Sequence, residues 1–256
     1  MDSQPNISRF AACLQVFRLT LRRQFFSRQT VVIGVLIGLA MAIMVTLSLF
    51  LQAGNFRDIE ELVAKINSRL FSGFLLPIIS LAYASSAISG ERTGQTLVYL
   101  LSTSIPRPLI YLSQYAAVLL LTLGVTLGGL AALCLAFGAD GLLALRGFAP
   151  VVALATICYV GLFLLFSAWV RRATFLALGY ALMIETLTAN IPGVVKCITV
   201  SFYANSWLYD DSPLGLRPVI PAYDPVSANT AVGVLIAASL GFLALGMWLF
   251  SRKEYE

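Results

Sequence analysis

Long apolar stretches, separated by short polar segments, dominate the pattern of the chain. Six of them reach or approach the roughly 20 residues that a helix needs to cross a bilayer core. They cover residues 31–50, 70–88, 110–137, 148–170, 174–188 and 228–250, and the second and fifth are close to the lower length limit. The pattern predicts a single all-α domain, residues 1–256, that forms a polytopic membrane protein with six transmembrane helices. Pro77 predicts a kink in the second helix.

The segment before the first stretch, residues 1–30, has an amphipathic pattern. At 100° per residue, one arc of a helix collects its apolar side chains, and the arginines lie off this arc. The apolar members are Phe10, Cys13, Leu14, Phe17, Leu21 and Phe25. This pattern predicts a helix that lies in the membrane interface and whose arginines reach the headgroups.

Composition agrees with a membrane protein and excludes several other classes. The chain is 59% apolar and 11% charged, whereas soluble domains are about 25% charged. A soluble enzyme, a disordered protein and a nucleic-acid-binding domain are therefore excluded. The chain has no histidine, its four cysteines show no CxxC spacing, and it carries no phosphate-binding P-loop motif. We accordingly expect no metal site, no cofactor and no catalytic residue in this chain, and no nucleic acid among its partners.

Orientation follows from the distribution of lysine and arginine between alternate connecting segments. If the N-terminus is cytoplasmic, eleven of the seventeen basic residues fall in cytoplasmic segments and six in outer ones. Cytoplasmic loops of membrane proteins carry the excess of positive charge. The count predicts a multi-pass protein with both termini in the cytoplasm.

The cytoplasmic segment between the second and third stretches differs in chemistry from the rest of the chain. It opens with Glu91 and Arg92 and closes with a Pro-Arg-Pro sequence centred on Arg107. Between them a short helical stretch carries leucines on one side, at positions 97, 100 and 101. A helix of two to three turns with one apolar face must bury that face against another surface.

This segment resembles the first cytoplasmic loop of the permease subunits of type-two ABC exporters. The positions in register with that loop are Glu91, Arg92, Thr96, Leu97, Leu100, Leu101, Ser102, Ile105, Pro106 and Arg107. The chain departs from the family pattern at Gln95, Ser104 and Gln114. The six-helix layout, the interfacial N-terminal helix and the charged C-terminal tail agree with the same family.

The resemblance implies that residues 91–107 form a coupling helix that docks on a separate ATPase subunit. Polar contacts are then expected from Glu91, Arg92, Gln95 and Thr96, and packing from Leu97, Tyr99, Leu100 and Leu101, with Arg107 closing the motif. It further implies two ATPase copies, a second permease subunit (a second copy of this chain, giving a homodimer, or a similar permease), residence in the cytoplasmic (inner) membrane of a bacterium, and no enzymatic activity in this chain. The alternative for this segment is a solvated connecting loop.

Two further features, both in the C-terminal half of the sequence, do not fit a simple transmembrane helix. Glu185 lies near the middle of the fifth stretch, where a charge is costly, so it either contacts substrate or ions or satisfies backbone groups where the span breaks. Residues 189–227, rich in proline, predict an outer re-entrant or interfacial loop, and Asp210 and Asp211 within it are expected to solvate the loop. Two pairs of glycines, 34 with 38 and 124 with 128, mark candidate close helix contacts.

Three other functions remain open on the sequence. An ion-driven secondary transporter would need several intramembrane polar groups and an internal repeat. A membrane-embedded lipid-modifying enzyme would need acidic or histidine residues that converge near one face. A membrane subunit that couples ATP use to assembly or signalling would share the same coupling segment.

Overall fold

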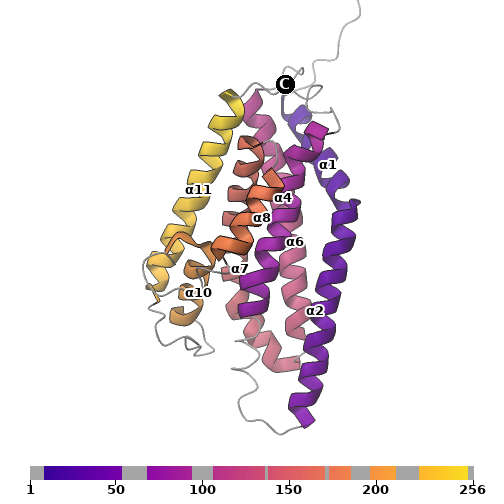
Figure 1. Ribbon diagram of the computed structural model, residues 1–256, viewed down its shortest axis with the longest axis vertical. Coiled ribbons are helices and arrows are strands. Elements are labelled where there is room, and N and C mark those ends of the chain that lie inside the picture. The colour runs from indigo at the N-terminus through magenta and orange to yellow at the C-terminus, as the bar shows by residue number, and fades with distance from the viewer. Residues whose placement is uncertain are drawn as a thin grey trace, which may run out of the picture.

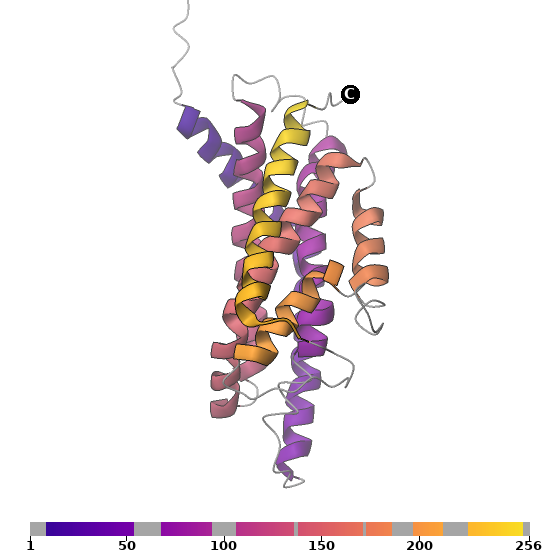
Figure 2. The same cartoon turned by 90° about the vertical axis from the view of Figure 1, so that its left-hand side faces the viewer.

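The computed structural model describes residues 9–53, 68–93, 106–135, 138–170, 173–185, 197–211 and 225–252 (Figures 1 and 2). Every element in these ranges is helical, which confirms the all-α prediction. Four helices are long and apolar enough to cross a membrane: α2 (Arg28–Ala53), α6 (Arg107–Leu135), α7 (Gly138–Trp169) and α11 (Ala228–Arg252). The chain is therefore compatible with a membrane protein.

The remaining elements are shorter. They are α1 (Arg9–Phe25), η1 (Ser68–Leu75), α4 (Leu76–Thr93), α8 (Ala173–Gly179), η2 (Tyr180–Glu185) and α10 (Val200–Asp211), where η denotes a π-helix. The second predicted span corresponds to η1 followed by α4, and the fifth to α8 followed by η2. With 7 and 6 residues, α8 and η2 together extend only about 20 Å at 1.5 Å per residue. The six-helix count thus stays a prediction.

Pro77 lies where the second predicted span changes its helix type. The chain is π-helical up to Leu75 and α-helical from Leu76 onward, so Pro77 is the second residue of α4. Because η1 continues directly into α4, Pro77 lacks an N–H that a regular helix would use there, and the change from π-helix to α-helix coincides with this missing donor. The expected irregularity at Pro77 is therefore a change of hydrogen-bonding register.

The helix α7 is the centre of the bundle. It packs against α4, α6, α8, α10 and α11, and its side chains from Val151 to Ala168 are largely buried. Polar side chains reinforce the packing: Ser167 donates to the carbonyl of Ala84 in α4 at 3.2 Å, and Tyr115 of α6 donates to the carbonyl of Ile157 at 3.4 Å.

The start of α7 differs from the sequence-based boundary. The fourth span was expected from residue 148, whereas α7 begins at Gly138 and continues through Pro150. A Cβ atom at Gly141 would collide with the backbone of Cys134 in α6. Glycine at 141 therefore allows the backbone near the start of α7 to lie against the end of α6.

In Figure 1, α2 and α6 run downward, whereas α4, α7 and α11 run upward, which gathers several helix ends at one end of the bundle. The helix α1, the end of α4, the start of α6 and the end of α11 all lie at the upper end in this view. Figure 2 shows α1 inclined to the long axis of the bundle. Within the described ranges, the residues that flank the predicted coupling segment thus lie at the same end of the bundle as the last turn of α11.

The outside of the bundle is markedly apolar. Large hydrophobic side chains are exposed along α2, α8 and α11 in particular. On the helix α1, two polar residues, Thr20 and Gln24, are buried, whereas Leu14 and Phe25, both members of its apolar arc, are exposed. Contiguous apolar surface of this kind marks a protein or membrane contact.

Among the residues that the structure describes, the glycine pairs of the sequence make no close contacts. A Cβ atom at Gly34, Gly38, Gly124 or Gly128 would meet nothing within 4 Å. The contact that these positions were expected to mark therefore remains a prediction for a neighbouring subunit.

Candidate functional site

The predicted coupling segment is only partly described by the structure. Glu91 and Arg92 belong to the last turn of α4, whose backbone continues to Thr93. Their side chains lie outside the described residues, as do Gln95, Thr96, Leu97, Tyr99, Leu100 and Leu101 in full. The structure thus places the start of the segment on a helix, and the docking contacts stay predictions.

Arg107 closes the predicted motif and is the first residue of α6. Its Nη1 atom donates to the backbone carbonyl of Ser251, at 3.5 Å, in the last turn of α11. The next residue, Arg252, lies over the ring of Trp248 at 4.6 Å. A cation near the carbonyl groups that end a helix is favourable. Arg107 therefore connects the start of α6 to the end of α11.

Glu185 is the most buried carboxylate among the described residues, with 2% of its surface exposed. Its Oε1 atom accepts from the amide of Val200 at 3.1 Å, and its Oε2 atom accepts from the amide of Ser201 at 3.3 Å. These are the first two amides of α10. The third, of Phe202, donates to the Thr199 hydroxyl at 3.3 Å. The first turn of α10 is therefore capped by one carboxylate and one hydroxyl.

Aromatic side chains surround the Glu185 carboxylate. The Tyr180 hydroxyl donates to its Oε1 atom at 3.2 Å. The Tyr180 ring in turn meets the rings of Phe163 and Phe166 edge to face, with centroids 6.1 Å away in each case. The apolar wall excludes water and strengthens the bonds to the carboxylate. This arrangement satisfies backbone groups where the fifth predicted span breaks, one of the two roles that the sequence left open.

A second carboxylate repeats the arrangement at the other end of α10. Asp210 Oδ2 accepts from the amide of Ala228, the first residue of α11, at 2.7 Å. The hydroxyls of Ser227 and Thr230 lie 2.8 Å apart across the same turn. Asp210 was expected to solvate a loop, but it caps a long helix. Sequence reasoning missed this role, although an acidic residue upstream of a Ser-x-x-Thr helix start was a usable signal.

The two caps form a continuous connection through α10. Glu185 links η2 to the start of α10, and Asp210 links the end of α10 to the start of α11. Within the described residues, no group of three His, Cys, Asp or Glu side chains lies close enough to hold a metal ion. These carboxylates accept hydrogen bonds from the first amides of α10 and α11 and thereby fix the positions of the helix ends.

A polar junction joins α1, α2 and α4 at the end of the bundle where α1 lies. Gln24 donates from Nε2 to the carbonyl of Tyr83 at 3.1 Å. The Tyr83 hydroxyl donates to Thr30 Oγ1 at 3.2 Å, and Thr30 donates to the carbonyl of Gln24 at 2.7 Å. The corner between α1 and α2 is therefore fastened to α4. No sequence-based expectation covered these residues, because the apolar arc of α1 was interpreted only as a membrane-facing surface.

Comparison with known proteins adds no relative. No protein-family model matches the chain, and no curated protein matches it significantly.

Proposed function

We propose that the chain is the membrane permease subunit of an ATP-driven exporter of the type-two ABC class. Two copies would form the translocation pathway, and each would bind one copy of a separate ATPase at the cytoplasmic face. The chain itself performs no catalysis. ATP binding in the partner would move the coupling segment, and the helices attached to it would open and close the pathway.

The observation that carries this proposal is the motif at residues 91–107 together with the helices that bound it. A lever must be attached rigidly to the elements that it moves. Glu91 and Arg92 continue the helix α4 without a break, and Arg107 begins α6 and holds the end of α11. Force applied between these residues would reach three helices directly.

The distribution of apolar surface supports insertion in a membrane. The exposed residues of α2 and α11 are chiefly apolar and include many large hydrophobic side chains, and the membrane-span windows of these helices bury little of their surface inside the chain. Lipid or a second permease copy would cover them. The open glycines at 34 and 38 on α2 fit the second copy at that position.

The test is co-purification of the chain with candidate ABC-type ATPases of the same organism. The variant combines Glu91→Ala with Leu97→Asp, which removes one polar and one apolar contact of the proposed coupling helix. The matched control, Asp140→Ala with Leu142→Asp, makes the same two changes in the first turns of α7, away from the segment. We expect the first variant to lose ATPase binding and the control to retain it.

Undiminished association in the Glu91→Ala, Leu97→Asp variant would overturn the coupling role. Equal loss in both variants would point to general destabilisation and would equally count against it. Helix content and the amount of protein extracted by mild detergent, measured for both variants, separate these two outcomes.

A further inference from the structure

The short helix α10 is attached to different neighbours at its two ends. It packs chiefly against α11 and α7, and Asp210 near its end accepts from the first amide of α11. At its start, the amides of Val200 and Ser201 donate to the Glu185 carboxylate of η2. Glu185 therefore links η2 to the unit that α10 forms with α11.

The side chain that makes this link stands on an irregular turn. Glu185 is the last residue of the π-helix η2, which follows α8 directly. π-Helices are rare in proteins, and those that occur are frequently found at functional sites. The link to α10 is thus a contact at which a change of conformation is plausible on structural grounds.

The Glu185 carboxylate depends on α10 for two of its donors. It accepts from the amides of Val200 and Ser201 and from the hydroxyl of Tyr180, which belongs to η2 itself. If the start of α10 moved away, the carboxylate would keep the Tyr180 bond and lose both amides. Because the Glu185 side chain is only 2% exposed, water would not replace them, and a buried charge that lacks partners is costly.

A further donor stands beside this carboxylate. Tyr159 of α7 is fully buried, and its hydroxyl interacts electrostatically with Glu185, yet it completes no hydrogen bond. Its ring stacks on the ring of Phe163, with centroids 5.8 Å apart. Buried tyrosine hydroxyls usually have a partner. The Tyr159 hydroxyl is therefore a donor held in place next to a carboxylate that other donors already occupy.

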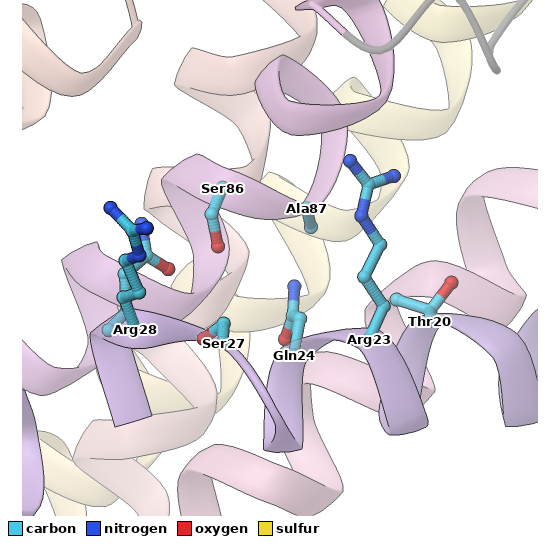
Figure 3. Close-up of a pocket in the computed structure, with 8 residues that line it drawn as sticks. Thr20, Arg23, Gln24, Ser27, Arg28, Ser86 and Ala87 are labelled. Atoms are coloured by element: carbon cyan, nitrogen blue, oxygen red, sulfur yellow. The ribbon is translucent and has the colours of Figure 1, made fainter. Parts of the chain in front are cut away.

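Another buried polar atom without a partner has a different explanation. The Oε1 atom of Gln24 also completes no hydrogen bond, but Gln24 lines a cavity of about 280 Å³ where the end of α1 faces α4 (Figure 3). A water molecule takes up about 30 Å³ in the liquid, so water fits beside Gln24. Tyr159 is not among the described residues that line this cavity, and its free hydroxyl needs another reason.

We propose that Tyr159 is a positioning residue that offers Glu185 a second hydrogen-bond partner, so that the start of α10 can leave η2 and return. In the described state, the amides of Val200 and Ser201 occupy the carboxylate. In the released state, the Tyr159 hydroxyl donates to it, while α10 moves with α11, to which Asp210 holds it. The inference does not depend on the ATPase partner of the proposed function.

Amide hydrogen exchange of the full chain in lipid nanodiscs tests the proposal at residues 200–202. These amides exchange when the first turn of α10 opens. Tyr159→Phe removes the second partner from the released state and an unpaired hydroxyl from the described state, and both effects favour the described state. We expect exchange at residues 200–202 to slow at least about tenfold, the lower end of what a hydrogen bond to a charged group contributes.

Two control variants calibrate the measurement. Tyr115→Phe removes a hydroxyl that donates to the carbonyl of Ile157, and exchange at residues 200–202 should not slow in this variant. Thr199→Ala removes the hydroxyl that accepts from the amide of Phe202, and it should speed exchange there, which shows that the signal reports the first turn of α10. Exchange in α6 should be the same in the original chain and in Tyr159→Phe.

A double variant tests whether Tyr159 acts through Glu185. In a chain with Glu185→Leu, the Tyr159 hydroxyl has no carboxylate to bind in either state. Adding Tyr159→Phe to this chain should therefore leave exchange at residues 200–202 unchanged within about twofold, because two residues that act through one contact are not additive.

Three results would overturn the proposal. Faster exchange in Tyr159→Phe would show that its hydroxyl holds Glu185 in the described state. Unchanged exchange would show that Tyr159 is no second partner. Slowing that persists in the Glu185→Leu chain would show that Tyr159 acts on α10 by another route.

Discussion

The Glu185 carboxylate accepts a hydrogen bond from the backbone amide of Val200 at 3.1 Å, and this contact joins the end of η2 to the start of α10. The carboxylate is buried, and its second oxygen accepts from the amide of Ser201. A negative charge at the start of a helix is favourable, because the amides there carry partial positive charge. Glu185 therefore supplies the acceptors for the first amides of α10, which are buried and do not reach water.

Replacing Glu185 with leucine should destabilise the protein. The amides of Val200 and Ser201 would lose their acceptors, and each buried orphan donor costs about 1–3 kcal/mol. We expect a loss of about 2 kcal/mol or more. For a chain of this size, roughly 2–4 °C per kcal/mol gives a drop of at least about 4 °C in the midpoint of thermal unfolding in detergent.

Glu185→Gln and Met183→Leu complete this test. The glutamine keeps one acceptor oxygen but not the charge, so its midpoint should fall between those of the leucine variant and the original chain. Met183 is exposed on the same π-helix, and its replacement should have no effect. A Glu185→Leu variant as stable as the original chain would show that the cap does not stabilise α10.

Asp210 should stabilise the start of α11. The change Asp210→Ala removes the acceptor for the Ala228 amide, which lies at 2.7 Å. The loss of a helix N-cap costs about 1 kcal/mol, which denaturant or thermal unfolding in detergent can detect. Asp210→Asn retains an acceptor and should recover most of the loss. If the asparagine and alanine variants are equally destabilised, the negative charge and not the hydrogen bond is the source of the stability.

Gly246 in α11 should not tolerate a side chain. A Cβ atom at this position would collide with the Tyr111 side chain of α6, and overpacking of a core costs about 1–3 kcal/mol. We expect Gly246→Ala to lower the unfolding midpoint. Combining it with Tyr111→Leu, which removes the ring, should cost less than the sum of the two single changes.

Gly233→Ala is the control on the same helix. A Cβ atom at Gly233 would meet nothing within 4 Å, and alanine is the better helix former by about 1 kcal/mol. This variant should be as stable as the original chain or slightly more stable. Similar destabilisation at both positions would mean that α11 does not pack on Tyr111 as described.

The helix α11 should cross the membrane completely. Its 25 residues extend about 37 Å, which exceeds the bilayer core of about 30 Å. In a chain without its four cysteines, Asn229→Cys and Arg252→Cys place one exposed thiol at each end. A maleimide that does not cross membranes should label the thiol at 229 in intact cells and the thiol at 252 only after the membrane is opened.

Labelling of both thiols in intact cells would contradict the crossing, and it would remove the basis of the proposed function. The reversed pattern would contradict the orientation with both termini inside, because the inner ends of α4 and α6 would then face away from a cytoplasmic ATPase.

The positions of the long helices could be predicted from the sequence better than the contacts between them. Runs of apolar residues located α2, α6 and α11 within a few residues of their bounds, since length and hydropathy are local properties. The fourth span was expected from residue 148 because Arg146 precedes the apolar run, whereas the helix α7 already begins at Gly138, where Gly141 lies against the backbone of α6. Burial of Thr20 and Gln24 on α1 was also missed, because the packed face of this helix is not its most apolar one.

The sequence by itself determined that the chain is helical and too apolar outside for water, because each helix is specified by residues next to one another in the chain. It also marked residues 91–107 and Glu185 as unusual. Only the tertiary structure decided what Glu185, Asp210 and Gln24 contact, because their partners are backbone groups and the positions of such groups depend on how distant helices pack. Backbone amides and carbonyls are identical at every residue, so no sequence pattern distinguishes the ones that will need a side chain.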